Sequence, residues 1–320
     1  MREVPVEEYL DFVSKKRSVV IEDQMIPLEP IEVSRLEPLP EELTDVSTTV
    51  WSFPERGSWA THRGDYRGNW APQIPRALIL RYTEPGDTVL DPMIGSGTTC
   101  IEAILLNRNC IAVDINYNAI MLTHHRLYYL INALKEGRYR DLLGYTRVRG
   151  EGVKAWYRVY HGDARDLDKI PGNSIDLVVT HPPYLNIIKY SEKELGGDLS
   201  RTRSLEEYLA LLKQVAREIY RVLKHGGVLG ILVGDTRIKK HYVPITYYVL
   251  LTLLDAGFIL KEEVIKIQHK MKTTREVWRK LRKRDFLLIY HEKLFILEKP
   301  SQIEKGLRYS AKQPFIELKL

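Results

Sequence analysis

Apolar, β-branched runs of strand length recur along the chain from residue 76 onward, and segments of helix length separate most of them. Strands that alternate with helices form βαβ units around a mainly parallel sheet. The pattern therefore predicts an α/β fold with a doubly wound, mainly parallel, seven-stranded sheet, and its last run predicts a terminal antiparallel hairpin joined by His291–Lys293. The runs are TVLD (88–91), CIAVDI (110–115), YRVYHGD (157–163), IDLVVT (175–180), GVLGILVGD (227–235), EEVIKI (262–267) and FLLIYHEKLFILEK (286–299). The helical segments are 98–107, 117–136, 204–224 and 243–256.

Composition divides the chain into four parts. Residues 1–50 are acidic and punctuated by proline, which predicts an arm packed on the surface. Residues 51–75 are rich in Trp, Gly and Arg and show no period, which predicts an ordered loop. The alternation of strands and helices occupies residues 76–300, and residues 301–320 form a C-terminal tail.

Charge is distributed unevenly along the chain. The formal net charge is +6, but residues 1–50 carry 12 Asp/Glu against 5 Lys/Arg, a net of −7 that leaves +13 on the rest. Residues 266–285 hold nine Lys/Arg and two acids around a tryptophan. Basic side chains beside an aromatic ring can contact phosphates and stack on bases, so this segment predicts nucleic-acid binding, with a solvated helix face as the alternative. The residues predicted to bind are Lys270, Lys272, Arg275, Trp278, Arg279, Lys280, Arg282, Lys283 and Arg284.

Neither membrane nor metal chemistry is indicated. No apolar stretch is long enough to span a membrane, and the N-terminal residues lack the apolar core of a secretory signal. Cys100 and Cys110 fall in apolar segments, which predicts two reduced core residues and a cytoplasmic protein. His62, His124 and His125 have no acids or cysteines at metal-ligand spacing, so we expect surface or packing residues and no metal site.

The strongest motif lies at the first predicted strand, which ends at Asp91 and continues through a glycine-rich turn into a helix that begins at Thr98. Gly95 and Gly97 allow a sharp bend and a close approach to a ligand, and the helix N-terminus offers unpaired N–H groups. A P-loop would require Lys where Thr98 stands, and Cys100 fills the third small position of a dinucleotide motif only loosely. A carboxylate at Asp91 would repel a pyrophosphate but attract an ammonium group, which favours S-adenosylmethionine as the cofactor.

Two further acids end the next two predicted strands. Asp114 lies 17 residues beyond Gly97, where a carboxylate can accept both ribose hydroxyls, and Asp163 lies where it can accept the amino group of adenine. Singly, each acid is explained as a helix cap or a turn residue, but three acids at successive strand ends predict a cofactor site. The predicted cofactor-binding residues are Asp91, Pro92, Gly95, Ser96, Gly97, Thr98, Asp114, Asn116, Asp163 and Ala164.

The fourth predicted strand ends in a double-proline corner. In a doubly wound sheet the first and fourth strands are neighbours at the switch point where ligands bind, so the corner is expected beside the glycine turn. Prolines lack N–H groups and fix φ, so the Pro182 carbonyl can be directed at an amino group, while the Tyr184 ring can stack on the base that carries this group. The predicted catalytic residues are His181, Pro182, Pro183 and Tyr184.

The glycine turn (91–99) and the His181–Tyr184 corner together resemble the N4-cytosine/N6-adenine amino-methyltransferases of nucleic acids, over about residues 70–300. The resemblance implies a Rossmann-like class I methyltransferase fold that binds S-adenosylmethionine at the turn and holds a flipped base at the corner for direct methyl transfer to its exocyclic nitrogen. A C5-cytosine enzyme would require a Pro-Cys nucleophile, and neither cysteine follows a proline. Glutamine methyltransferases of proteins share a similar Asn-Pro-Pro-Tyr motif. A protein or small-molecule target is therefore one alternative, and a non-catalytic nucleic-acid binder that kept the fold is another.

One residue departs from the family pattern. The family has Asp, Asn or Ser before the two prolines, and this chain has His181. A neutral imidazole can accept an amino hydrogen and take up the proton that methylation releases; alternatively, His181 only caps the strand and the Pro182 carbonyl makes the contact. The absence of an acidic acceptor favours cytosine over adenine.

The chain leaves little room for a domain that reads duplex DNA. Only residues 185–227 lie between the corner and the fifth strand, and a helix occupies much of this stretch. A folded RNA that is recognised by its shape and an exposed base is therefore the favoured partner, with site-specific DNA methylation as the alternative. The chain also resembles an archaeal branch of the family, some of which modifies cytidine N4 in ribosomal RNA. We thus expect an S-adenosylmethionine-dependent methyltransferase that acts on N4 of cytosine in ribosomal RNA.

Overall fold

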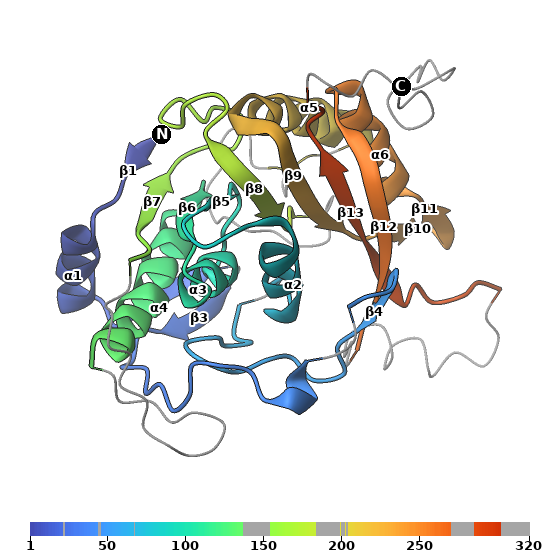
Figure 1. Ribbon diagram of the computed structural model, residues 1–320. Coiled ribbons are helices and arrows are strands. Elements are labelled where there is room, and N and C mark those ends of the chain that lie inside the picture. Colours follow the sequence, from blue (N-terminus) through green and yellow to red (C-terminus); the bar gives the residue numbers. More distant parts are fainter. Residues whose placement is uncertain are drawn as a thin grey trace.

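The computed structural model describes residues 1–21, 23–43, 46–66, 68–136, 154–183, 199, 202, 204–269 and 285–301. Within these ranges the centre of the molecule is a nine-stranded sheet with the order β1-β7-β6-β5-β8-β9-β13-β12-β4 (Figure 1). Two separate hairpins pair β2 with β3 and β10 with β11. The strands are β1 Arg2–Glu3, β2 Ser18–Ile21, β3 Gln24–Pro27, β4 Val50–Ser52, β5 Thr88–Asp91, β6 Asn109–Asp114, β7 Tyr157–His161, β8 Ile175–Thr180, β9 Leu223–Val233, β10 Thr236–Ile238, β11 His241–Val243, β12 Ile259–Ile267 and β13 His291–Glu298. The helices are α1 Val6–Lys15, α2 Gln73–Tyr82, α3 Thr98–Leu105, α4 Tyr117–Glu136, α5 Leu205–Val222 and α6 Ile245–Asp255, with a 3-10 turn at Pro40–Glu42.

The middle of the sheet has the doubly wound, parallel arrangement that the strand–helix alternation predicts. β7, β6, β5, β8 and β9 run parallel to one another. The predicted pairing of the first and fourth strands is confirmed, because Val89 of β5 lies opposite Leu177 of β8. Parallel strands end at the same edge of a sheet, so the glycine turn after β5 and the double-proline corner after β8 emerge side by side.

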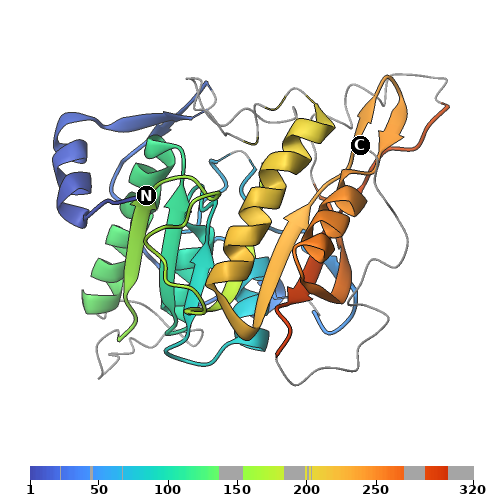
Figure 2. The same ribbon diagram turned by 90° about the horizontal axis from the view of Figure 1, so that it is seen from above.

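Helices cover both faces of the sheet, with α2, α3 and α4 on one face and α5 and α6 on the other (Figures 1 and 2). Successive strand residues therefore pack into different apolar clusters: Val89 joins the cluster beneath α2–α4, and Leu90 joins the cluster beneath α5 and α6. Strands that are buried on both faces need apolar residues at every position. This is why these strands appear in the sequence as apolar runs and do not alternate between apolar and polar residues.

The first 52 residues supply an edge strand on each side of the sheet. β1 pairs antiparallel with β7, and β4 pairs parallel with β12 at the opposite edge. Helix α1 packs against α4, where buried His124 donates through Nε2 to the Val4 carbonyl at 2.9 Å and the Tyr9 hydroxyl lies 2.8 Å from His125 Nδ1. These two histidines are packing residues, which confirms that part of the prediction.

The segment rich in Trp, Gly and Arg packs against α3. Trp59 Nε1 and His62 Nε2 lie 2.7 and 2.6 Å from Glu102 Oε1, and Arg76 donates to Oε2 at 3.0 Å. Glu102 is fully buried, so these partners compensate for the loss of its hydration. The contacts fix the aperiodic stretch between β4 and the start of α2 at Gln73, whose described residues form no helix or strand.

The predicted hairpin within residues 286–299 is wrong in its boundaries. His291–Glu298 form one strand, β13, which pairs antiparallel with β12 and with β9. The polar triplet that suggested a turn lies inside β13, because its charges are matched across the ladder. Glu292 pairs with Lys266 and Lys293 with Glu263, each at 2.8 Å. The antiparallel partner of β13 on this side is therefore β12, and the two strands come from separate runs of the sequence.

The prediction of two reduced cysteines is also wrong. Cys100 of α3 and Cys110 of β6 form a disulfide, and their Cα atoms are 5.4 Å apart. Helix α3 packs on the neighbouring strand, which brings two apolar positions ten residues apart into the range that a disulfide requires. Each cysteine occupies an apolar run of its own, so the pattern gave no sign of this pairing. Among the described residues no helix is both long enough and apolar enough to cross a membrane.

Candidate functional site

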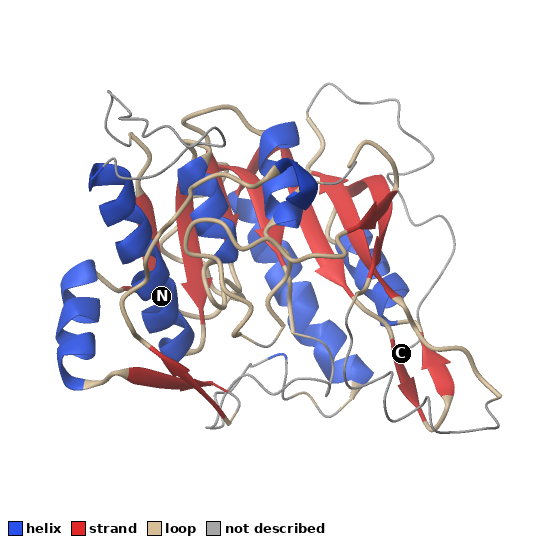
Figure 3. Cartoon of the chain, turned by 90° about the horizontal axis from the view of Figure 1, so that it is seen from below, coloured by secondary structure: helices blue, strands red, loops and turns tan. Residues whose placement is uncertain are grey.

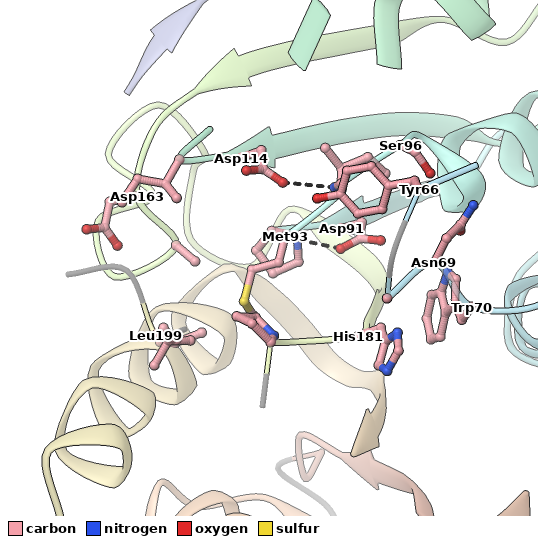
Figure 4. A pocket seen from close by; sticks show the side chains of 18 of the residues that line it. Tyr66, Asn69, Trp70, Asp91, Met93, Ser96, Asp114, Asp163, His181 and Leu199 are labelled. Carbon is pink, nitrogen blue, oxygen red and sulfur yellow. Dashed lines mark hydrogen bonds between the residues drawn. The ribbon is translucent and has the colours of Figure 1, made fainter. Parts of the chain in front are cut away.

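The carboxyl ends of the parallel strands border an open cavity of about 770 Å³, a volume that includes solvent space at its mouth. Figure 4 shows Asp163, Asp114 and Asp91 one after another along this edge, with Trp70 and His181 beyond Asp91. The predicted residues that line the cavity are Asp91, Pro92, Gly95, Ser96, Asp114, Asp163, Ala164, His181 and Pro183.

Asp91 is buried at the end of β5, with 2% of its surface exposed. The Thr99 hydroxyl donates to its Oδ2 at 2.6 Å, and the Met93 N–H donates to its Oδ1 at 3.1 Å. Burial raises the pKa of Asp91 to about 7, although both hydrogen bonds favour the charged form. A carboxyl group whose pKa burial shifts this far, on the wall of a cavity, is a candidate functional group.

The glycine turn is held rigidly by residues of α4. Gly95 adopts a left-handed φ of 55°, and a β-carbon at this position would lie 3.1 Å from the Tyr66 ring. The Thr123 hydroxyl donates to the Gly95 carbonyl at 3.0 Å, and the buried Arg126 donates to the Ser96 carbonyl at 3.0 Å. The turn therefore has its shape fixed by contacts within the protein.

Asp114 ends β6 directly beside this turn. Its Oδ2 accepts from the Gly95 N–H and its Oδ1 from the Asn116 N–H, both at 2.8 Å. A carboxylate has about four acceptor positions, so Asp114 can also accept from a ligand in the cavity. Asn116 is not among the described residues that line the cavity; its Oδ1 accepts from the Asn118 N–H at 2.9 Å, near the start of α4.

Asp163 follows β7 and is partly exposed to the cavity. Both of its carboxylate oxygens accept from the Arg165 guanidinium, with a shortest distance of 2.6 Å. Arg165 also lines the cavity, and the sequence pattern gave no reason to select it. The acceptor expected for an adenine amino group is thus an Asp163–Arg165 ion pair in this structure.

His181 is the first residue after β8 and lines the cavity. Its ring stacks on the Trp70 indole, with centroids 5.7 Å apart and planes inclined by 15°. Burial lowers the pKa of His181, while the Glu292 carboxylate and a hydrogen bond with the Gly68 backbone act in the opposite direction. The imidazole is therefore neutral at neutral pH.

One wall of the cavity comes from residues that the sequence analysis did not select. Tyr66, Gly68, Asn69 and Trp70 all lie in the segment 51–75. Asn69 Oδ1 accepts from the Thr98 hydroxyl at 2.6 Å, which ties this wall to the start of α3. Gly97 and Thr98 support the turn from behind and are not among the described lining residues. The high density of aromatic residues in this aperiodic segment could have indicated the wall, because large apolar side chains are usually buried and a solvated loop would expose them.

Part of the predicted site lies outside the described residues. This applies to Tyr184 of the double-proline corner and to all nine residues predicted to bind nucleic acid, which fall within 270–284. The cavity as described is therefore built from the glycine turn, the strand-end acids, the 51–75 segment, and His181 and Pro183 of the corner, whereas Pro182 is buried and is not among the described lining residues.

Two family models match the chain. The model described as DNA methylase (N6_N4_Mtase) matches residues 4–124 and 175–314, and the model described as RMKL-like methyltransferase domain matches residues 68–240. The first match takes in the glycine turn, the double-proline corner and the N-terminal segment. It confirms the resemblance that the two motifs indicated.

Individual relatives include methyltransferases of DNA and of RNA. The type II methyltransferase M2.MboI from Moraxella bovis is 33% identical over 86 residues, which are 27% of this chain and 32% of that protein. The tRNA (guanine(10)-N2)-dimethyltransferase from Methanothermobacter thermautotrophicus is 23% identical over 209 residues, which are 65% of this chain and 48% of that protein. The chain spans less than a third of the length of the type II methyltransferases that it matches.

Among solved structures, a SAM-dependent methyltransferase from Methanosarcina mazei aligns with a TM-score of 0.42 at 17% identity, over 70% of this chain and 97% of that chain. The fold assignment rests on the strand order and pairing described above. The family assignment rests on the DNA methylase model, which matches well over half of the chain. The chain belongs to the N6/N4 DNA methylase family of S-adenosylmethionine-dependent methyltransferases.

Proposed function

We propose that the protein transfers a methyl group from S-adenosylmethionine to the exocyclic amino group of a base in RNA, with N4 of cytosine as the favoured atom. The observation that carries this proposal is that the glycine turn after β5 and two residues of the corner after β8, His181 and Pro183, line the same cavity. A methyl donor at the turn and a base at the corner would be placed for direct, in-line transfer, which is a reaction that positioning alone can accelerate strongly.

The charges of the cavity residues suit S-adenosylmethionine. Asp91 would hold the ammonium group of its amino-acid part, Asp114 the ribose hydroxyls, and the Asp163–Arg165 pair would lie at the adenine end. The Ser96 hydroxyl is buried on the cavity wall and has no hydrogen-bond partner among the described residues, as expected for a group that awaits a ligand. When bound, the cofactor supplies a methyl group made electrophilic by its positively charged sulfur.

The base would be held at the corner. The Pro182 carbonyl would accept one amino hydrogen, and the Tyr184 ring would stack on the base. Such hydrogen bonds draw the lone pair of an exocyclic amine out of conjugation with the ring, which makes the nitrogen a better nucleophile. No covalent enzyme–base step is required.

His181 would accept the proton that the reaction releases. When the amino nitrogen bonds to the methyl carbon, the carbon–sulfur bond breaks, and the nitrogen must lose one proton to become neutral. A neutral imidazole has one ring nitrogen that can accept a proton. The nearby Glu292 carboxylate would stabilise the imidazolium that forms.

Two findings support RNA as the substrate. The tRNA methyltransferase from Methanothermobacter thermautotrophicus aligns with 65% of this chain, whereas the type II methyltransferase M2.MboI aligns with 27% of it. Guanine N2, which the name of that tRNA enzyme specifies, is itself an exocyclic amino group. The chain between β8 and α5 is also too short for a separate domain that reads duplex DNA.

The test is methyl transfer by the full chain from labelled cofactor to small-subunit ribosomal RNA transcribed in vitro, with duplex DNA of equal length as the competitor. Digestion to nucleosides and mass spectrometry then identify the product, and we expect N4-methylcytidine in the RNA. Label that enters only DNA, at one short sequence, would overturn the RNA assignment, and N6-methyladenosine would overturn the choice of cytosine.

Site-specific methylation of DNA is the second candidate function. It is favoured by the DNA methylase family model and by the type II methyltransferases among the relatives. The same assay distinguishes it, because its duplex arm gives N4-methyldeoxycytidine or N6-methyldeoxyadenosine.

The corner can be tested independently of the nucleic acid's identity. Tyr184→Ala should lose most turnover but bind the cofactor with unchanged affinity in calorimetry, because the ring would contact only the base. His181→Ala should slow the chemical step in single-turnover kinetics. In the wild type this step should slow as the pH falls through the pKa of His181, since only the neutral ring accepts a proton. Turnover at the wild-type rate in both variants would show that the corner has a purely structural role.

A further inference from the structure

The β10–β11 hairpin lies at the edge of the sheet where the carboxyl ends of the parallel strands border the cavity. β9 runs parallel to β8, with Thr180 opposite Ile231, and it ends two residues later at Val233. The chain then enters the hairpin, which projects past the carboxyl ends of the strands (Figures 2 and 3). It therefore stands next to the strand that ends at the His181 corner.

The charge of this hairpin is entirely positive. Residues 236–243 read TRIKKHYV, with three Lys/Arg and no acid. Lys239, Lys240 and His241 are exposed, and Ile238 and Tyr242 expose 54% and 41% of their surfaces. Basic groups interleaved with apolar and aromatic ones are suited to a polyanion that also carries rings, which is the chemistry of a nucleic-acid strand.

The tip of the hairpin is built in an unfavourable way. Ile238 pairs with His241, so Lys239 and Lys240 form a two-residue turn, and both have positive φ, at 48° and 73°. A turn of this kind favours Asn-Gly, because residues with a β-carbon rarely adopt such angles. Two adjacent lysines at these positions lower the stability of the turn. Backbone strain of this kind is found at functional sites, so it favours a function for the two side chains.

The base of the hairpin is fixed to the rest of the fold by Arg237. Its guanidinium donates to the Lys240 carbonyl at 3.0 Å and to the Leu287 carbonyl at 2.7 Å. It also lies over the Tyr242 and Phe286 rings, at 5.4 and 5.2 Å from their centroids. Arg237 thus anchors the hairpin that carries the tip lysines, and Lys240 Nζ lies 3.5 Å from the exposed Asp285 carboxylate.

We infer that the tip of the β10–β11 hairpin binds the sugar–phosphate backbone of the substrate strand, with Lys239 and Lys240 each contacting a phosphate. The inference rests on the proposed function and adds to it a binding element beside the cavity. Phosphate contacts carry no sequence information, but they fix the register of a strand. At this edge, the register would set which nucleotide reaches the His181 corner.

The test replaces the two lysines with Asn-Gly, as Lys239→Asn/Lys240→Gly in the full chain. This variant removes both charges and relieves the turn, so its melting temperature should equal or exceed that of the wild type. The matched control is Lys224→Asn/Lys261→Asn, which removes two charges near the opposite ends of the strands, in β9 and β12. The probe is small-subunit ribosomal RNA transcribed in vitro, titrated over a series of salt concentrations.

Each phosphate contact contributes about 0.7 to the slope of log affinity against log salt for a single strand, so the hairpin variant should lose about 1.4 from the slope. Affinities that converge at 1 M salt then differ on the order of 25-fold at 0.1 M salt. The control should keep the wild-type slope, as should Lys239→Arg/Lys240→Arg, which retains both charges. The KM for RNA should rise in the Asn-Gly variant with kcat unchanged.

A wild-type salt slope in the Asn-Gly variant would overturn the hairpin inference and leave the proposed function intact. An equal loss in the Lys224/Lys261 control would also overturn it, because net charge and not the hairpin would then govern affinity. If the wild-type chain neither binds nor methylates RNA, the proposed function fails, and the inference fails with it.

Discussion

Replacement of Asp91 by asparagine should make the protein more stable at alkaline pH while weakening cofactor binding. Burial raises the pKa of Asp91 from 3.8 to about 7. At 1.36 kcal/mol per pH unit, the ionised form costs about 4 kcal/mol of folding free energy. Asparagine has the same shape and no charge, so it removes this cost. The amide oxygen of asparagine can keep one of the two hydrogen bonds from Thr99 and Met93, but the amide nitrogen cannot accept the other. This loss offsets the gain by about 1–2 kcal/mol.

The sign of the pH dependence follows from the direction of the shift. Between pH 3.8 and about 7 the native Asp91 binds a proton that the unfolded chain does not bind, so wild-type stability falls as the pH rises through this window. The penalty is fully present above pH 7 and absent below pH 3.8. The stability advantage of Asp91→Asn should therefore be about 2–3 kcal/mol larger at pH 8 than at pH 5.

Urea denaturation at these two pH values measures the difference, and calorimetry measures cofactor affinity. Asp11→Asn is a suitable control for stability, because Asp11 is an exposed acid on α1. We expect Asp91→Asn to bind S-adenosylmethionine at least tenfold more weakly, and wild-type affinity to fall about tenfold per pH unit below pH 7. A stability difference that does not vary with pH would refute the account of the buried carboxyl group. Unchanged cofactor affinity would refute its role as the ammonium acceptor.

Three further predictions concern other parts of the structure. Asp114→Ala should weaken cofactor binding by about 10- to 150-fold in calorimetry, since bonds to a charged acceptor contribute about 1.5–3 kcal/mol, and unchanged affinity would contradict the assignment to the ribose. Burial lowers the pKa of His124 to about 4 from 6.5, so the stability that it contributes is fully present above pH 6.5 and is lost as the pH falls to about 4. His124→Gln, whose amide can still donate to Val4, should flatten the acid limb of a plot of unfolding free energy against pH, and an unchanged limb would exclude His124 as its cause. Cys100→Ala/Cys110→Ala should lower the free energy of unfolding by about 3 kcal/mol. A wild-type melting temperature that is insensitive to reductant would show that the cross-link does not contribute.

The sequence determined the parts of the protein that depend on local pattern. Strands buried on both faces must be apolar throughout, so β5 to β9 were visible as runs. Helix α4 was predicted at its observed limits, because a long helix needs a sustained period of apolar positions. The glycine turn and the double-proline corner could be found from single residues, since only Gly and Pro have their particular backbone conformations.

The tertiary structure decided everything that depends on which distant residues meet. The cavity wall from Tyr66 to Trp70 has no period, and its shape comes from contacts of its own segment with Glu102 on another element. The charged start of β13 could be a strand only because β12 places opposite charges across from it. The Cys100–Cys110 bond depends on the packing of α3 against β6. Local pattern reports the preferences of a segment by itself, whereas burial, ion pairing and cross-linking are properties of pairs, and the fold alone determines the pairs.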